Sequence, residues 1–434
     1  MNNIEYKNIP IYALLILLPI SIVLGSSVSL INVLLIDIFF IVHIIFKKDF
    51  SFFKEKNVKL LFILFIYLTI NTFISQDPSL SYIRNIGFIR WVIFFAALIY
   101  FFRLISLEII LKFWSFFILI VVADIFFEVY KGSNLLGYVS PYGNRIVSFF
   151  KDEPIVGGYL NAFYLIIIGA FFNFFQNRLN KYFFLIFALS LIIFLAIFLT
   201  GERSNSIKAL ISFLLFYNLF DRLTFKKKFL GFLILTILII TALFSSHFLK
   251  IRYVNQLFSP YVMKDASSFT KDGELDVVGN IMRRSILTNF NDHVYYKIYK
   301  TGISIFKDKP ILGVGNKNFR LISCKLAVEE NKKNNKEFIC TTHPHQTYIE
   351  LLSEHGLIGT IIILTILFHL ILKNYKSMID SNNYLQKGCF SFLVVYFIPL
   401  LPSGSFFTDY NLTLFMLNLS LYYASDTKNF LKKI

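Results

Sequence analysis

The sequence predicts an all-α polytopic membrane protein with about 12 transmembrane helices and one large loop that contains short helices. The 434 residues are 56% hydrophobic and only 16% charged, and their mean hydropathy is +0.65. A soluble fold of this size could not bury so much apolar surface. The apolar residues form continuous runs of roughly 20 residues rather than the alternating pattern of a β-barrel. Because lipid offers no partner to backbone N–H and C=O groups, each run is expected to be a helix.

Short loops separate the expected spans, apart from the large loop between the ninth and the tenth. The first run lacks a small-residue cleavage site and is soon followed by the second, so we expect a retained helix rather than a cleaved signal. The expected spans cover residues 9–25, 29–46, 59–75, 84–102, 108–129, 156–175, 182–200, 205–220, 229–248, 356–373, 388–402 and 406–424.

Lys and Arg residues alternate from loop to loop along the chain. They are abundant in the even-numbered loops and in the C-terminal tail, whereas the short odd-numbered loops contain few. This pattern predicts that both termini are cytoplasmic and that the odd-numbered loops lie outside. It also explains the net charge of +17 without nucleic acid, because no basic stripe with interleaved aromatic residues stands outside the spans.

Three regions follow from this topology. Residues 1–248 are expected to form a membrane bundle of spans 1–9, residues 249–346 the large outer loop, and residues 347–434 spans 10–12 with a cytoplasmic tail. Within the loop, residues 295–306 have the periodicity of an amphipathic helix that ends before Pro310. The loop ends in two histidines at the membrane surface, so we expect it to carry part of an active site.

His343 and His345 flank Pro344, immediately before a helix that continues into the tenth span. Proline disfavours a helical conformation in the residue before it, so the pair is expected to stay outside the helix. Near neutral pH an uncharged imidazole can take a proton from an attacking hydroxyl. The alternatives are a histidine that caps the helix or binds interfacial water, and a metal site completed by His355 or Glu350. No cysteine pair has zinc-site spacing, so we expect no metal.

Several cations could bind an anion near these histidines. Arg203 lies at the outer end of the seventh span, where its guanidinium could bind phosphate oxygens bidentately or simply anchor the helix. Arg320 and Lys317 follow Gly313 and Gly315. Two glycines could let backbone N–H groups approach an anion, or they could form a helix cap and turn.

Further candidates lie at the mouth of the sixth span and in the large loop. Glu153 could orient a substrate hydroxyl or interact with the helix dipole. Arg145 and His293 are additional candidate ligands for a phosphate group. Cys324 and Cys340 are expected to form a disulfide if the loop faces an oxidising compartment, the alternative being two unrelated thiols.

The end of the loop combines several motifs: Pro310-Ile311-Leu312-Gly313-Val314-Gly315, then His343-Pro344-His345-Gln346, then a Leu-rich helix and Gly356-Leu357-Ile358-Gly359. The combination resembles the O-antigen ligase and O-antigen polymerase superfamily of bacterial envelope glycosyltransferases. The resemblance is best over residues 293–360, and it extends loosely to residues 150–160 and 199–204. Gln346 stands where the family usually has Asn.

The resemblance implies transfer of a glycan from undecaprenyl pyrophosphate to a sugar hydroxyl. His345 would be the base, with His343 as a second candidate, and Arg203 with a loop Arg or Lys would stabilise the leaving pyrophosphate. The displacement would invert the anomeric centre without a cofactor or metal. The acceptor would be lipid A–core in a ligase or a second lipid-linked glycan in a polymerase, with a protein acceptor as a third option.

A transporter or lipid-linked oligosaccharide flippase is the alternative from another class. Such proteins usually need ionisable residues or broken helices at mid-membrane depth. Here strongly charged residues are nearly absent from the middles of the spans, with Asp37 and Asp124 as the main exceptions. We therefore expect a multi-pass enzyme of the bacterial inner membrane, with its active site in the periplasm.

Overall fold

The computed structural model describes residues 9–151, 153–220, 224–255, 268–269, 275–276, 294–332 and 338–426. The described residues are mainly helical, with one two-residue antiparallel pair, β1 (Ser268–Phe269) and β2 (Leu275–Asp276). The helices are α1 (Ile9–Ile16), α2 (Leu18–Leu24), α3 (Ser26–Lys47), α4 (Lys56–Ile74), α5 (Pro78–Ile86), α6 (Ile89–Leu104), α7 (Leu107–Lys131), α8 (Val156–Phe174), α9 (Leu179–Leu199), α10 (Arg203–Asn218), α11 (Phe225–Ser245), α12 (His247–Lys250), α14 (Val294–Asp308), α15 (Phe319–Lys332), α16 (Thr347–Leu372), α17 (Tyr375–Asp380), α18 (Tyr384–Tyr396) and α19 (Asp409–Ala424).

Eight helices in the described part of the chain are long and apolar enough to cross a membrane. They coincide with eight of the expected spans, which confirms a multi-pass helical membrane protein. The remaining expected spans coincide with shorter helices, namely α1 with α2, α10, α18 and α19. The expected total of about 12 spans stays a prediction.

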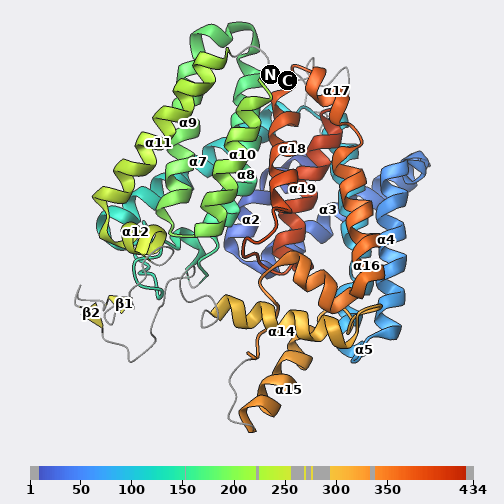
Figure 1. Cartoon of the computed structure of the whole chain (residues 1–434). Helices are drawn as coiled ribbons and strands as arrows, with labels where there is room; N and C mark the ends of the chain where they lie inside the picture. The colour runs from blue at the N-terminus through green and yellow to red at the C-terminus, as the bar shows by residue number, and fades with distance from the viewer. Residues whose placement is uncertain are drawn as a thin grey trace.

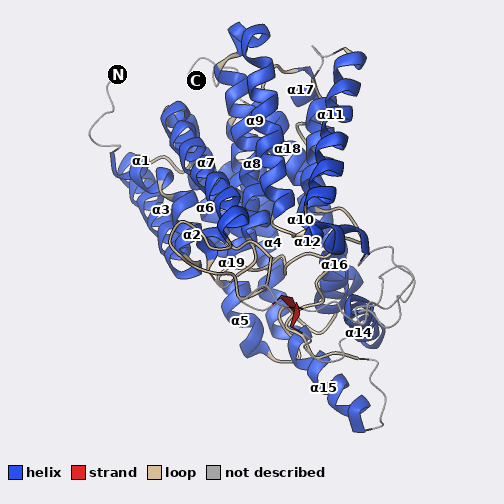
Figure 2. Cartoon of the chain, turned by 90° about the vertical axis from the view of Figure 1, so that its left-hand side faces the viewer, coloured by secondary structure: helices blue, strands red, loops and turns tan. Residues whose placement is uncertain are grey.

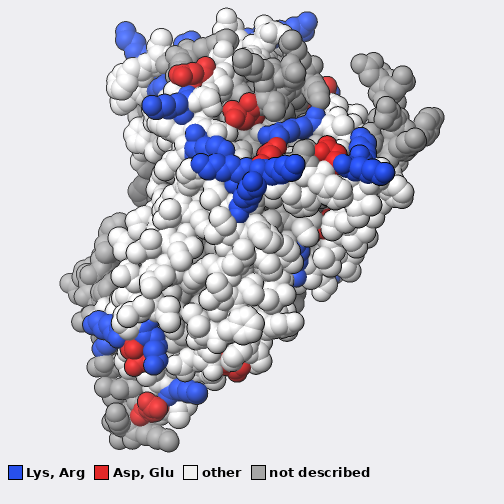
Figure 3. Space-filling view, turned by 90° about the vertical axis from the view of Figure 1, so that its right-hand side faces the viewer, with Lys and Arg blue, Asp and Glu red and all other residues white. Residues whose placement is uncertain are grey.

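The loop helices gather at one end of the bundle. α5, α14 and α15 lie at this end and α17 at the other (Figures 1 and 2). α4 runs between the two ends. Near its start Asn57 accepts a bond from Lys373 at 2.9 Å, and just after its end Gln76 donates to the carbonyl of Val314 at 2.9 Å. Figure 3 shows a broad, largely uncharged band between two charged zones, as expected of a lipid-facing surface.

α8 is buried on nearly all sides, and α18 crosses it at backbone contact. A Cβ on Gly169 would lie 2.5 Å from the carbonyl oxygen of Tyr384, and one on Gly388 would lie 2.3 Å from the carbonyl oxygen of Leu165. Small residues at such crossings let membrane helices approach closely. The crossing fixes α8, and therefore the end of α8 that lies near Glu153.

Two carboxylates of α7 hold the loop that follows this helix. Asp124 accepts bonds from the backbone N–H of Leu135 at 2.7 Å and from the hydroxyl of Ser148 at 2.5 Å. Glu128 accepts from the backbone N–H groups of Val147 at 3.2 Å and Ser148 at 2.6 Å. Asp124, an exception among the spans, thus satisfies loop donors that would otherwise be buried without partners.

Candidate active site

The histidine pair lies immediately outside α16. Gln346 caps this helix, its side-chain oxygen accepting a bond from the N–H of Ile349 at 2.7 Å. His345 has a φ of +53°, a conformation that side-chain-bearing residues rarely adopt. Its carbonyl accepts a bond from the N–H of Ser403 at 2.9 Å, and the Ser403 hydroxyl lies 3.0 Å from that of Thr347. The segment before α19 therefore holds the backbone of His345, as expected of strain kept at a functional site.

The two glycines of the Pro-x-x-Gly-x-Gly motif allow two backbones to cross. α16 is interrupted at Gly356, where φ is +64°. Gly313 has a φ of +70°, and a Cβ there would lie 2.5 Å from the backbone nitrogen of Gly356. The N–H groups of Val314 and Gly315 donate to the carbonyls of Ser353 at 3.0 Å and Glu354 at 2.8 Å. The motif therefore clamps the interruption in α16, and these two N–H groups are not available to an anion.

Lys317 belongs to this clamp rather than to a substrate surface, in contrast to the expectation. Its side chain is buried, and its Nζ lies 3.8 Å from a carboxylate oxygen of Glu350 and donates to the hydroxyl of Ser405. The Ser405 hydroxyl donates in turn to Glu350, and the N–H of Phe406 donates to the same carboxylate at 3.0 Å. A buried ion pair with these added hydrogen bonds joins the loop, α16 and the segment before α19.

The next residues attach the loop to α4 and α5. The N–H of Asn316 donates to the amide oxygen of Asn71 at 2.9 Å, and its carbonyl accepts from Ser81 at 2.6 Å. The side chain of Asn318 accepts from the N–H of Asp77 at 2.8 Å and donates to Ser81 at 3.0 Å. These buried hydrogen bonds, with both ends of the Asn318 amide engaged, specify one arrangement of the loop on the bundle.

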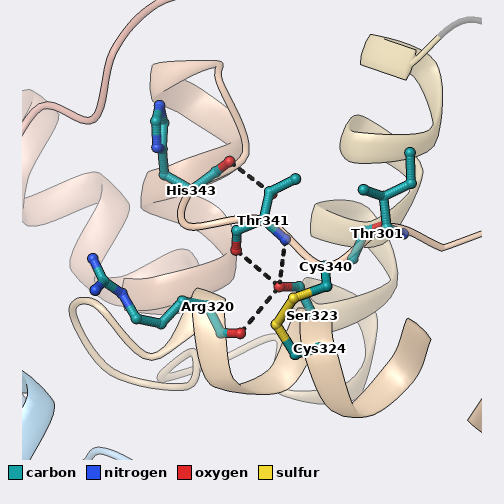
Figure 4. Close-up of a disulfide and its surroundings, with 8 residues drawn as sticks. Thr301, Arg320, Ser323, Cys324, Cys340, Thr341 and His343 are labelled. Carbon is teal, nitrogen blue, oxygen red and sulfur yellow. Dashed lines mark hydrogen bonds between the residues drawn. A yellow bond between two sulfur atoms is a disulfide. The ribbon is translucent and has the colours of Figure 1, made fainter. Parts of the chain in front are cut away.

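Cys324 and Cys340 form the expected disulfide, which joins α15 to the segment that leads to the histidines (Figure 4). Beside it, the Ser323 hydroxyl accepts from the N–H of Thr341 at 3.3 Å and donates to its carbonyl at 3.0 Å. In Figure 4 the His343 ring and the Arg320 guanidinium extend to the same side of this disulfide. The disulfide and Ser323 together fix the chain just before His343.

The two imidazoles lie against each other, with ring centroids 4.0 Å apart. Burial, followed by the positive potentials of His345, Lys317 and Arg320, lowers the pKa of His343 to about 3. Burial also lowers the pKa of His345 from its usual value. Both rings are therefore neutral near pH 7 and able to accept a proton.

Tyr295, in the first turn of α14, connects the histidines to a group of cations. Its ring lies 5.9 Å from the His345 ring, with the two planes at 84°. The Tyr295 phenol also lies close enough to Arg252 to contribute to the pKa of that guanidinium. Arg252 follows α12, in a π-helical turn at Ile251–Asn255.

Three guanidiniums gather around the turn between α9 and α10. Nε of Arg252 donates to the carbonyl of Gly201 at 3.0 Å, and Nη1 of Arg203 lies 3.5 Å from the carbonyl of Arg252. Burial, with repulsion from Arg203 and Arg145, lowers the pKa of Arg252 to about 10. We call Arg145, Arg203 and Arg252 the arginine cluster. Like charges held this close oppose one another, so an anion between them would be favourable.

Glu202, the residue before Arg203, bonds the turn between α9 and α10 to neighbouring helices. Its carboxylate accepts from the N–H of Gly157 at 2.7 Å, in the first turn of α8, and from the side chain of Asn205 at 2.6 Å. Burial raises the pKa of Glu202, while these bonds and the charge of Arg145 oppose that shift. A Cβ on Gly157 would lie 2.9 Å from the Glu202 carboxyl carbon, which explains the glycine. Glu202 therefore has a positioning role.

Residues 187–364 match the family described as O-antigen ligase. The chain contains an O-antigen ligase family domain. Enzymes of this family transfer glycans from lipid-linked carriers. No curated protein matches the sequence.

The O-antigen ligase domain contains Arg203, Arg252, Tyr295 and both histidines, whereas Arg145 lies before it. The chain after the domain also contributes: the segment before α19 supplies Ser403, and α19 supplies Tyr410. The Tyr410 hydroxyl donates to the carbonyl of Ile155 at 3.0 Å, close to Glu153, which precedes the first residue of α8. His293 lies outside the described residues.

The O-antigen ligase domain contains two site residues that the sequence did not single out. Arg252 follows the ninth expected span, and a cation at the outer end of a span was the signal that selected Arg203. Tyr295 begins the expected amphipathic helix and follows the candidate His293 closely, but the sequence assigned no role to its aromatic ring. Among the described residues, no group of three or more His, Cys, Asp or Glu side chains could hold a metal. His355 instead bonds the Tyr67 hydroxyl at 3.3 Å, away from the histidine pair.

Proposed function

We propose that this protein transfers a glycan from a polyprenyl pyrophosphate, most simply undecaprenyl pyrophosphate, to a sugar hydroxyl in an O-antigen ligase reaction. The observation that carries the proposal is the continuity from His345 through Tyr295 to the arginine cluster. A proton acceptor thus lies near a group of cations, and these are the two requirements of a displacement that expels a diphosphate.

In the proposed reaction, neutral His345 takes the proton of the acceptor hydroxyl as its oxygen attacks the anomeric carbon. The bond from that carbon to the pyrophosphate oxygen breaks, and the polyprenyl pyrophosphate leaves with the electron pair. One displacement inverts the anomeric centre. The lowered pKa of His345 keeps the imidazole uncharged before the reaction.

The arginine cluster would bind the two phosphates of the donor. A guanidinium stays charged at neutral pH even where repulsion lowers its pKa, and its planar fork matches phosphate oxygens. Arg320 is exposed, and its positive charge helps to lower the pKa of His343. We propose that it binds a polar group of the acceptor. Glu153, at the outer end of α8, would orient a hydroxyl of the donor.

We further propose that this end of the bundle faces the periplasm of a bacterial inner membrane, with both termini cytoplasmic. The loops rich in Lys and Arg support this orientation, because Lys47 and Lys56 end α3 and begin α4 at the opposite end. The disulfide beside the histidines also supports it, since disulfides persist in oxidising compartments. Residues 249–346 would then be the large periplasmic loop between two parts of the membrane bundle.

Deletion of the gene, followed by analysis of the envelope glycans, tests the proposed function. A ligase that uses lipid A–core as its acceptor predicts bare core together with free lipid-linked polymer. A polymerase, the alternative within the family, predicts core that carries a single repeat unit. Envelope glycans unchanged from those of the parent strain would contradict both.

A further inference from the structure

We propose that Tyr295 is a positioning residue whose ring stabilises the imidazolium that His345 becomes when it takes the proton. This inference rests on the proposed function and deepens it, because it assigns a role in the same reaction to a residue that neither the sequence motifs nor the family match singles out.

The position of Tyr295 is fixed by the way α14 lies on the histidine segment. Ile298, Thr301 and Ile305 are buried along one face of the helix. A Cβ on Gly302 would lie 2.3 Å from Cγ2 of Ile349 and 3.4 Å from Cβ of Pro344. α14 therefore lies directly on the residues around the histidines, and this contact, two turns along the helix, determines where Tyr295 meets His345.

The Tyr295 and His345 rings meet edge to face, with centroids 5.9 Å apart and planes at 84°. The face of a phenol ring carries negative potential and attracts a cation more strongly where water is excluded. Burial disfavours a positive charge on His345, and the His343 ring 4.0 Å away is itself kept neutral by burial and by the charges of Lys317 and Arg320. The aromatic ring offsets this cost of burial at the moment the proton arrives.

The same placement gives Tyr295 a selective effect on the reaction. Neutral His345 gains little from an aromatic face, whereas the imidazolium gains most, so the contact strengthens towards the transition state. Interactions of that kind raise kcat and leave the binding of substrate unchanged. A desolvated cation–π contact corresponds to a rate factor of roughly 10.

The test uses the purified full-length protein in detergent, a synthetic polyprenyl-pyrophosphate glycan as donor and a soluble core oligosaccharide as acceptor. The variants are Tyr295→Phe, which keeps the ring, and Tyr295→Leu, which keeps apolar bulk without it. Tyr299→Leu is the matched control. Tyr299 lies one turn further along α14, and its ring centroid is 6.2 Å from that of Tyr295. Thermal unfolding of each variant is measured alongside.

We expect Tyr295→Phe and Tyr299→Leu to retain the kcat of the natural protein, and Tyr295→Leu to lose roughly 10-fold in kcat with an unchanged KM for the donor. The acidic limb of the pH–rate profile should move to lower pH in Tyr295→Leu, since the protonated ring loses stabilisation. A purely structural loosening would admit water and move that limb in the opposite direction, towards the ordinary pKa of histidine.

Three results would overturn the inference while leaving the proposed function intact: full kcat in Tyr295→Leu, equal losses in Tyr295→Leu and Tyr299→Leu, or a loss in Tyr295→Phe as large as in Tyr295→Leu. No transfer by the natural protein, under conditions in which it stays folded, would instead remove the proposed function and this inference with it.

Discussion

Nε of Arg252 donates a hydrogen bond to the carbonyl oxygen of Gly201 at 3.0 Å, which joins two segments 51 residues apart in the chain. Gly201 has a φ of +72°, and a Cβ there would lie 2.9 Å from the ring of Phe248 and 4.0 Å from the side chain of Arg145. The turn after α9 can therefore bring the arginine cluster together only because it contains a glycine.

Replacement of Arg252 by Lys should reduce glycan transfer although the charge is kept. A lysine cannot donate from Nε to Gly201 while presenting a planar fork to phosphate, so we expect a loss of roughly 10-fold in kcat/KM. Arg178→Lys is the control, because Arg178 lies beyond the far end of α8. Transfer assays with purified protein compare the two variants, and equal activity in both would limit Arg252 to a structural role.

The rate of transfer should stay high at pH values below 6.5, the ordinary pKa of histidine. His345 must be neutral to act, and burial lowers its pKa, so the acidic limb of the pH–rate profile is displaced downwards. Folded stability should also fall as the pH decreases below 6.5, because the unfolded chain then binds protons that His343, with a pKa of about 3, does not. An acidic limb centred at pH 6.5 or above would instead indicate that the His345 imidazole is exposed to water.

Removal of the disulfide by Cys324→Ser with Cys340→Ser should loosen the histidine segment. The bond closes a loop of 16 residues, for which chain entropy predicts about 3 kcal/mol of stabilisation. We expect faster hydrogen exchange over residues 338–345 and slower transfer, with Ser323 retaining part of the order. Cys389→Ser is the control, since Cys389 is a free buried cysteine in α18. Unchanged exchange in the double variant would argue that Ser323 alone fixes the segment.

Gly313→Ala should disrupt the clamp at the interruption of α16. A Cβ there would lie 2.5 Å from the backbone nitrogen of Gly356, and we expect a loss of about 4 kcal/mol or more in stability. Gly137→Ala is matched to it, because Gly137 also has a positive φ, +80°, but no atom within 4 Å of its Cβ. That variant should lose only about 1 kcal/mol. Thermal unfolding in detergent measures both losses. The difference between them is the cost of the steric clash with Gly356, because both variants carry the cost of the positive φ.

The sequence predicted the helical membrane class well because long apolar runs allow few other structures. It also placed α14 within two residues at each end, since the hydrophobic face of an amphipathic helix repeats at a readable spacing. It could not foresee the interruption at Gly356, because the residues around this glycine continue a helical pattern. The interruption depends on Gly313, which is distant in sequence and reaches it only in the folded protein.

The histidines and Arg203 could be proposed as site residues from the sequence because their residue types and positions carry chemical meaning. The role of Lys317 could not, since a buried ion pair with Glu350 and a substrate-facing lysine look alike in a sequence. Arg252 was passed over because a cation near a membrane span has an ordinary explanation as an anchor. Its contacts with Gly201 and Arg203 distinguish it from cations that only anchor a span.

The most direct test of the account is the rate of glycan transfer by purified His345→Ala with a polyprenyl-pyrophosphate donor. We predict a loss of at least 100-fold with unchanged thermal stability, because the neighbouring His343, with a pKa of about 3, is too weak a base to replace His345. His369→Ala, at the far end of α16, should transfer at the natural rate. Transfer by His345→Ala at the rate of the natural protein would contradict the assignment of His345 as the base.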